Sequence, residues 1–163
     1  MKILIAEDEI DLADLYFEFL TDSGHEVFLT SNGQQCVEKY FDQIEENSDQ
    51  APFDVVILDQ IMPELTGMDV AKRILGEFPE QRIIFVSAHL DNTLIESIKN
   101  LKQLLETLQK PFEFQLLLDM IEDKKIYLEL KKLNVNIKNL KELQPTHEQI
   151  KDYLEAFRKL QTC

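Results

Sequence analysis

Short apolar segments that each end in a polar side chain constrain the fold of this 163-residue chain more than any other feature. The clearest is Val-Val-Ile-Leu at 55–58, which Asp59 follows directly. Similar segments lead to three other positions, with 3–6 ending at Glu7 and Asp8, 83–86 at Ser87, and 104–108 just before Lys110. Such runs are typical of strands buried on both faces of a parallel sheet. Because parallel strands end at the same edge of a sheet, we expect these polar groups to lie close together.

The polar groups at this edge favour phosphoryl-transfer chemistry. Carboxylates that share an edge repel each other unless a cation lies among them, and Mg²⁺ is commonly held by one or two carboxylates with waters and phosphate oxygens. A carboxylate such as Asp59 can attack phosphorus and form an aspartyl phosphate. Lys110 offers a compact positive charge, and Ser87 offers a hydroxyl. Each residue alone has a more ordinary interpretation, since an Asp after a strand is commonly a helix N-cap and Lys-Pro is commonly a turn.

Between these segments the apolar residues recur with helical spacing, which predicts alternating strands and helices. We expect strands at about 2–6, 26–30, 55–59, 82–86 and 104–108, and helices at about 11–22, after the turn at 31–33, at 67–77, at 91–102 and from 112 onward. Five such units predict an α/β, flavodoxin-like (βα)5 doubly wound parallel sheet of order 2-1-3-4-5, plus C-terminal helices. The residues of the first helix predicted to face the core are Leu12, Leu15, Phe19 and Tyr16. Cys36 is predicted to be buried, and 45–52 to be an acidic surface loop.

As a set, these segments resemble the receiver domain of two-component response regulators. The resemblance covers residues 1 to about 122, and its motifs are Ile3-Leu4-Ile5-Ala6-Glu7-Asp8-Glu9, Asp54 to Pro63 followed by Gly67-Met68-Asp69, Ser87-Ala88, and Lys110-Pro111-Phe112. It implies that Asp59 is the phosphoacceptor and that a histidine kinase or a phosphotransfer protein donates the phosphoryl group. It also implies a downstream effector protein that responds to the phosphorylated state.

The resemblance further implies a Mg²⁺ site around the phosphoacceptor. Asp8 and Asp59 would bind the metal directly, together with the backbone carbonyl of Ile61. Glu7 would act mostly through a metal-bound water. Glu7-Asp8 stands where two aspartates are commoner, and this departure conserves the charge.

Two further roles and one departure concern the residues that would contact the phosphoryl group. By the resemblance, Ser87 would bond the phosphoryl oxygens and Lys110 would pair with them. Thr107 occupies the position, three residues before the lysine, where these domains usually carry an aromatic switch residue. The phosphorylation site is therefore expected to be intact, while the usual aromatic switch is absent from position 107.

Composition bounds the class of protein. A length of 163 residues fits one domain with a small addition, and no apolar run approaches the roughly 20 residues of a membrane span. The N-terminus is predicted to be a strand and not a signal peptide, so we expect a cytoplasmic protein. The two cysteines, Cys36 and Cys163, make neither a disulfide framework nor a zinc site.

The last forty residues differ from the rest in charge and in pattern. Residues 123–163 hold 9 Lys/Arg and 6 Asp/Glu, a net charge of +3, whereas 1–122 have a net charge of −17. Apolar residues recur at helical spacing in 123–163, which predicts a helical extension that packs on the receiver or acts in dimerisation or partner binding. The acidic receiver makes nucleic acid an improbable partner.

The leading hypothesis is a signalling receiver that is not an enzyme acting on an outside substrate, although it would catalyse its own phosphorylation and dephosphorylation at Asp59. One alternative is a minimal DNA-binding transcriptional regulator that uses the C-terminal helices. Another is a Mg²⁺-dependent phosphatase that works through an aspartyl phosphate. Such phosphatases commonly carry a second Asp two residues after the nucleophile, and Ile61 at that position disfavours this interpretation.

Overall fold

The computed structural model describes residues 1–45, 50–88, 94, 96–97 and 105–123. The chain divides into two compact units, Met1–Phe114 and Gln115–Cys163. The predicted helix at 91–102 (apart from 94 and 96–97), residues 46–49 of the acidic loop and the predicted C-terminal helices lie outside the described residues. The boundary predicted between 122 and 123 stays a prediction.

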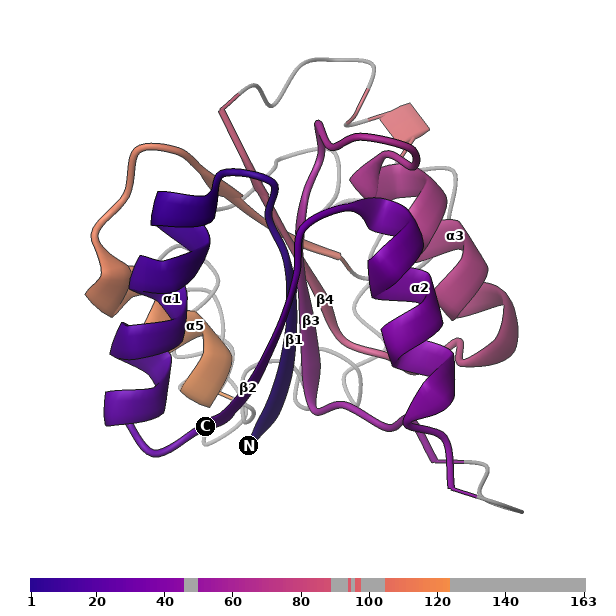
Figure 1. Ribbon diagram of the computed structural model, residues 1–163, viewed down its shortest axis with the longest axis horizontal. Coiled ribbons are helices and arrows are strands. Elements are labelled where there is room, and N and C mark those ends of the chain that lie inside the picture. Colours follow the sequence, from indigo (N-terminus) through magenta and orange to yellow (C-terminus); the bar gives the residue numbers. More distant parts are fainter. Residues whose placement is uncertain (46–49, 89–93, 95, 98–104, 124–163) are drawn as a thin grey trace, which may run out of the picture. The chain divides into compact units, whose positions relative to one another are not determined.

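A single five-stranded sheet organises the first unit (Figure 1). All of its pairings are parallel, and the order is β2-β1-β3-β4-β5, as the sequence predicted. The strands are β1 (Lys2–Ala6), β2 (Glu26–Thr30), β3 (Val55–Asp59), β4 (Ile83–Ser87) and β5 (Glu106–Gln109). The last two begin one and two residues later than predicted. Boundaries are the least certain part of such predictions because strand ends depend on pairing with a neighbour.

Helices cover both faces of the sheet. In the first unit, α1 (Ile10–Asp22) lies on one face, while α2 (Gly33–Asp42) and α3 (Gly67–Glu77) lie on the other (Figure 1). A further helix, α5 (Phe114–Glu122), begins at the end of this unit. Among the described residues, no helix is long and apolar enough to cross a membrane.

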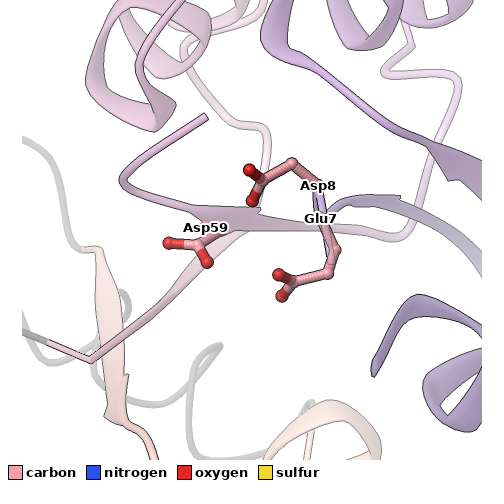
Figure 2. Close-up of side chains that lie close together, drawn as sticks. All are labelled: Glu7, Asp8 and Asp59. Carbon is pink, nitrogen blue, oxygen red and sulfur yellow. The ribbon is translucent and has the colours of Figure 1, made fainter. Parts of the chain in front are cut away.

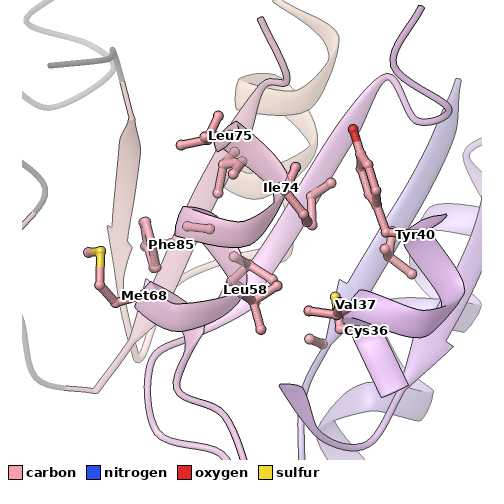
Figure 3. Close-up of a cluster of buried hydrophobic side chains, with 14 of the residues drawn as sticks. Cys36, Val37, Tyr40, Leu58, Met68, Ile74, Leu75 and Phe85 are labelled. Atoms are coloured by element: carbon pink, nitrogen blue, oxygen red, sulfur yellow. The ribbon is translucent and has the colours of Figure 1, made fainter. Parts of the chain in front are cut away.

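A buried hydrophobic cluster lies between α2, α3 and the sheet, where Figure 3 shows Cys36, Tyr40, Leu58, Ile74 and Phe85 packed together. Residues 55–58 are buried on both faces, which explains why this strand shows no polar alternation. Cys36 is buried as predicted, and burial raises the pKa of its thiol to about 12. The thiol therefore stays protonated and unreactive at neutral pH.

The prediction of which α1 side chains face the core was partly wrong. Ala13, Tyr16 and Leu20 are buried, whereas Leu15 is 49% exposed. The three buried positions follow the spacing of three and four residues that keeps side chains on one helix face. Leu15 is one residue from Tyr16, about 100° around the helix axis and away from that face.

Candidate functional site

Three carboxylates meet at the carboxyl edge of the sheet, and Figure 2 shows them grouped there. Glu7 and Asp8 follow β1, and Asp59 ends β3; these strands are neighbours, with Ala6 paired to Leu58. One carboxylate oxygen from each residue lies within 4.8 Å of those of the other two. The predicted convergence of the acidic residues is thus present in the described structure.

The three acids differ in exposure. Glu7 is 2% exposed and Asp59 is 8% exposed, whereas Asp8 is open to solvent. Buried carboxylates need a positive or hydrogen-bonding partner because ionised groups are costly to remove from water. Glu7 and Asp59 therefore need a partner inside the protein, while Asp8 is accessible to an ion arriving from solution.

Lys110 is the partner of the two buried acids. Its Nζ donates to Glu7 Oε2 at 2.8 Å and to Asp59 Oδ2 at 2.6 Å. The lysine is held beside β4, because its backbone N–H donates to the carbonyl of Ser87 at 2.9 Å. Ser87 itself ends β4 and is buried. The structure thus brings Lys110 to the acids.

The electrostatics of the pair reflect burial and charge together. Burial raises the pKa of Glu7 above its usual range, and the hydrogen bond and charge of Lys110 offset only part of this effect. For Lys110, burial acts to lower the pKa, but the hydrogen bonds and charges of Asp59 and Glu7 outweigh it, so its pKa is raised. Lys110 therefore stays a cation.

This donor set fits a hard divalent cation. Within the described part of the chain, three carboxylates share one ammonium group at this edge, which leaves an excess of negative charge. Mg²⁺ prefers carboxylate oxygens and keeps several waters, so one open acid beside two buried ones suits it. Asp8, Asp59 and Glu7 are the groups that could hold such an ion.

The loop after Asp59 is shaped by close backbone contacts. The N–H of Ile61 donates to Asp59 Oδ1 at 3.1 Å, while the Ile61 side chain is 66% exposed. Gly67 lies so close that a Cβ atom there would collide with the backbone carbonyl oxygen of Asp59. Thr66 and Asp69 then cap α3 with reciprocal hydrogen bonds. The start of α3 therefore fixes the backbone of the phosphoacceptor candidate.

The structure also shows where two further residues, Thr107 and Tyr16, lie. Thr107 lies exposed on β5, paired in register with Phe85. The sequence analysis did not assign Tyr16 to the site, yet the charges of Glu7 and Asp59 act on its hydroxyl. The inward position of Tyr16 on α1 agrees with the prediction from helical spacing, whereas no sequence signal related its hydroxyl to the acidic residues.

Comparison with known proteins decides the family. The family model of the response regulator receiver domain matches residues 3–122. The chain belongs to this family. Members of this family accept phosphoryl groups in a Mg²⁺-dependent way within two-component systems, and work with histidine kinases and downstream effectors. This agrees with the fold class and the function predicted from the sequence.

Individual relatives show how far the similarity extends. The receiver is 32% identical over 113 residues to the transcriptional regulatory protein CrdR of Helicobacter pylori, an alignment that covers 69% of this chain and 49% of that protein. It is 28% identical over 124 residues to the chemotaxis protein CheY of Listeria monocytogenes, covering 75% of this chain and 96% of that protein. This chain therefore spans about half the length of CrdR, while its receiver portion matches nearly all of CheY.

Solved structures support the same fold. A CheY-like response regulator receiver domain protein from Methanospirillum hungatei superposes with a TM-score of 0.67 at 20% identity. The superposition covers 80% of this chain and 97% of that structure. At this level of identity the likeness concerns the fold.

Proposed function

We propose that Asp59 is the phosphoacceptor of this receiver and takes one phosphoryl group from a phosphohistidine donor. The observation that carries the proposal is the position of Asp59, a buried carboxylate 2.6 Å from Lys110 Nζ and beside Glu7 and Asp8. A histidine kinase or a phosphotransfer protein is the donor that the family relationship suggests.

In the reaction, a carboxylate oxygen of Asp59 attacks phosphorus while the P–N bond of the phosphohistidine breaks. The bonding electron pair leaves with the histidine nitrogen, and an acyl phosphate forms on Asp59. Lys110 neutralises charge on the transferring oxygens, and the Ser87 hydroxyl donates a hydrogen bond to them. The Ile61 N–H holds the other carboxylate oxygen in place.

Asp8 and Asp59 would hold Mg²⁺ directly with the Ile61 carbonyl, and Glu7 would act through a bound water. The ion would supply positive charge that lets an anionic phosphate approach three carboxylates. Because Asp8 is the exposed member of the set, it is the one best placed to recruit the ion from solution.

The test is intact mass after incubation with acetyl phosphate and Mg²⁺. Wild type should gain one phosphoryl group, and Asp59→Asn should gain none. Asp54→Asn is the matched control, because Asp54 precedes the opposite end of the same strand and accepts a hydrogen bond from the Lys2 N–H at 2.8 Å. The assignment would be contradicted if Asp59→Asn still gained a phosphoryl group, or if Asp54→Asn failed to gain one while Asp59→Asn did.

For the output, we propose that residues 1–122 form the receiver and that 123–163 form a helical extension acting in dimerisation or partner contact. The net charge of −17 on 1–122 supports protein contacts over nucleic acid. Size measurement with and without acetyl phosphate, on the full chain and on a chain ending at 122, tests this. A phosphorylation-dependent change in size that needs 123–163 supports the dimer, and salt-sensitive nanomolar binding to duplex DNA would contradict the proposal.

A further inference from the structure

The hydroxyl of Tyr16 is a buried donor that the reaction described above does not use. The residue is 1% exposed, and its hydroxyl has no hydrogen-bond partner among the residues that the structure describes. Buried polar groups in native proteins are nearly always paired, because an unpaired one keeps its full desolvation penalty. An unpaired hydroxyl beside a functional site therefore calls for a partner in another state of the protein.

Aromatic packing holds the ring of Tyr16 in place. The ring of Tyr16 stacks on Phe112 with centroids 6.2 Å apart and an angle of 7° between planes, and it meets Phe114 edge-on at 5.5 Å. Phe112 comes two residues after Lys110 in the chain. The ring is thus held against the segment that carries the site lysine.

The hydroxyl stays a donor at neutral pH. Burial raises the pKa of Tyr16, and the negative charges of Glu7, Asp59 and Glu9 raise it further. A protonated phenol can donate one hydrogen bond. The nearby groups that act on it are all carboxylates.

Glu7 would lose its strongest protein donor after phosphorylation, which leaves it with the metal-bound water proposed above and the Glu9 N–H. Its carboxylate now accepts a strong bond from Lys110 at 2.8 Å and a long one from the Glu9 N–H at 3.5 Å. A phosphoryl group on Asp59 would attract Lys110 with more negative charge than the free carboxylate does. A carboxylate that is only 2% exposed cannot replace the lost bond with bulk water.

We propose that Tyr16 is a positioning residue whose hydroxyl donates to Glu7 when Lys110 turns toward the phosphoryl group on Asp59. The inference rests on the proposed function of Asp59. Tyr16 then stabilises the phosphorylated state and has no bond to lose in the unphosphorylated one. Tyr16 lies on α1 and its ring stacks on Phe112. A movement of Tyr16 would therefore carry a signal to both segments without an aromatic residue at position 107.

The experiment compares Tyr16→Phe with Tyr40→Phe. Tyr40 is the matched control, because it is also fully buried but lies on α2, where its hydroxyl donates to Gln81 at 2.7 Å. For each protein, acetyl phosphate with Mg²⁺ gives the rate of phosphoryl gain, and removal of the donor gives the rate of decay. Urea unfolding of the unphosphorylated proteins gives their stability.

Tyr16→Phe should lower the ratio of the gain rate to the decay rate about tenfold, the size expected for loss of a hydrogen bond to a charged group. Its unfolding midpoint should equal or exceed that of wild type. Tyr40→Phe should show the reverse, with an unchanged ratio and a lower midpoint. An unchanged ratio in Tyr16→Phe, or a loss of stability as large as in Tyr40→Phe, would overturn the inference about Tyr16 and leave the proposed function of Asp59 standing. A wild-type protein that gains no phosphoryl mass would overturn both.

Discussion

The two ends of the β4–β5 pair differ in how their positive and negative side chains are balanced. At the amino end, Arg82 and Glu106 form a bidentate ion pair with distances of 2.7 and 2.9 Å, while Gln81 accepts from Tyr40 and donates to the Arg82 carbonyl. At the carboxyl end, the same strands lead to Ser87 and Lys110, and that lysine serves two buried carboxylates.

The comparison separates stability from function. Among the residues that the structure describes, the amino end pairs one guanidinium with one carboxylate, and removing either partner deprives the other of this ion pair in a mostly buried position. The carboxyl end is unmatched, because a third carboxylate remains for the one lysine in the described structure. We infer that the matched end holds the strands together, while the unmatched end is available to a cation and a phosphoryl group.

The largest expected effect comes from breaking the matched end. Arg82→Ala should lower the free energy of unfolding by about 3–5 kcal/mol, because the Glu106 carboxylate would lose its partner in a buried position. Urea unfolding measures this. Arg73→Ala, on the exposed side of α3, is the control and should change stability by less than about 0.5 kcal/mol. Equal effects of the two substitutions would contradict the role given to the ion pair.

A smaller effect is expected where α3 approaches Asp59. Gly67→Ala should cost about 1–3 kcal/mol, because its Cβ would collide with backbone, and it should also slow phosphoryl uptake. Gly76→Ala, in the same helix with open space around it, should instead stabilise the protein by about 0.5–1 kcal/mol. Thermal unfolding and the acetyl phosphate assay distinguish the two variants. Unchanged stability and normal phosphoryl uptake in Gly67→Ala would show that the close approach to Asp59 is not needed.

The smallest effect concerns the cap of α3. Thr66→Ala should cost about 1 kcal/mol, the usual value of an N-cap, while Thr66→Ser should retain most of the stability. The hydrogen bond from Thr66 lowers the pKa of Asp69, so its contribution is present above the ordinary pKa of an aspartate and is lost as the pH falls through the folded value. The difference in unfolding free energy between wild type and Thr66→Ala should therefore become smaller toward acid pH, while the part due to the bond from the Asp69 N–H to Thr66 Oγ1 remains. A difference that stays constant with pH would contradict this assignment.

Much of this arrangement could be predicted from local patterns. Apolar runs alternating with helical patterns predict the strands and the order of the sheet, and the rule that parallel strands share an edge predicts that Glu7, Asp8 and Asp59 lie together. Gly67 and the cap at Thr66 agree with the predicted start of a helix at 67. These features depend on a few neighbouring residues, and each neighbour is visible in the sequence.

Contacts between distant segments could not be predicted in this way. The Arg82–Glu106 pair depends on the register of β4 against β5, with Ile84 opposite Glu106, and a shift of one residue would remove it. Lys110 was expected near the acidic residues, but its two simultaneous hydrogen bonds, to Glu7 and to Asp59, depend on how three chain segments approach one another. Leu15 was wrongly predicted to be buried, because its apolar character did not reveal the phase of the helix.

The most direct test of the unmatched edge is the stability of the protein as a function of Mg²⁺ concentration. Wild type should become more stable as Mg²⁺ is added, by about 2.7 kcal/mol at a concentration 100 times the Kd. Asp8→Asn removes the exposed member of the acidic set, so it should be at least as stable as wild type without metal and should gain little with it. The same gain in both proteins, or no gain in wild type, would contradict the claim that this edge is built for a cation.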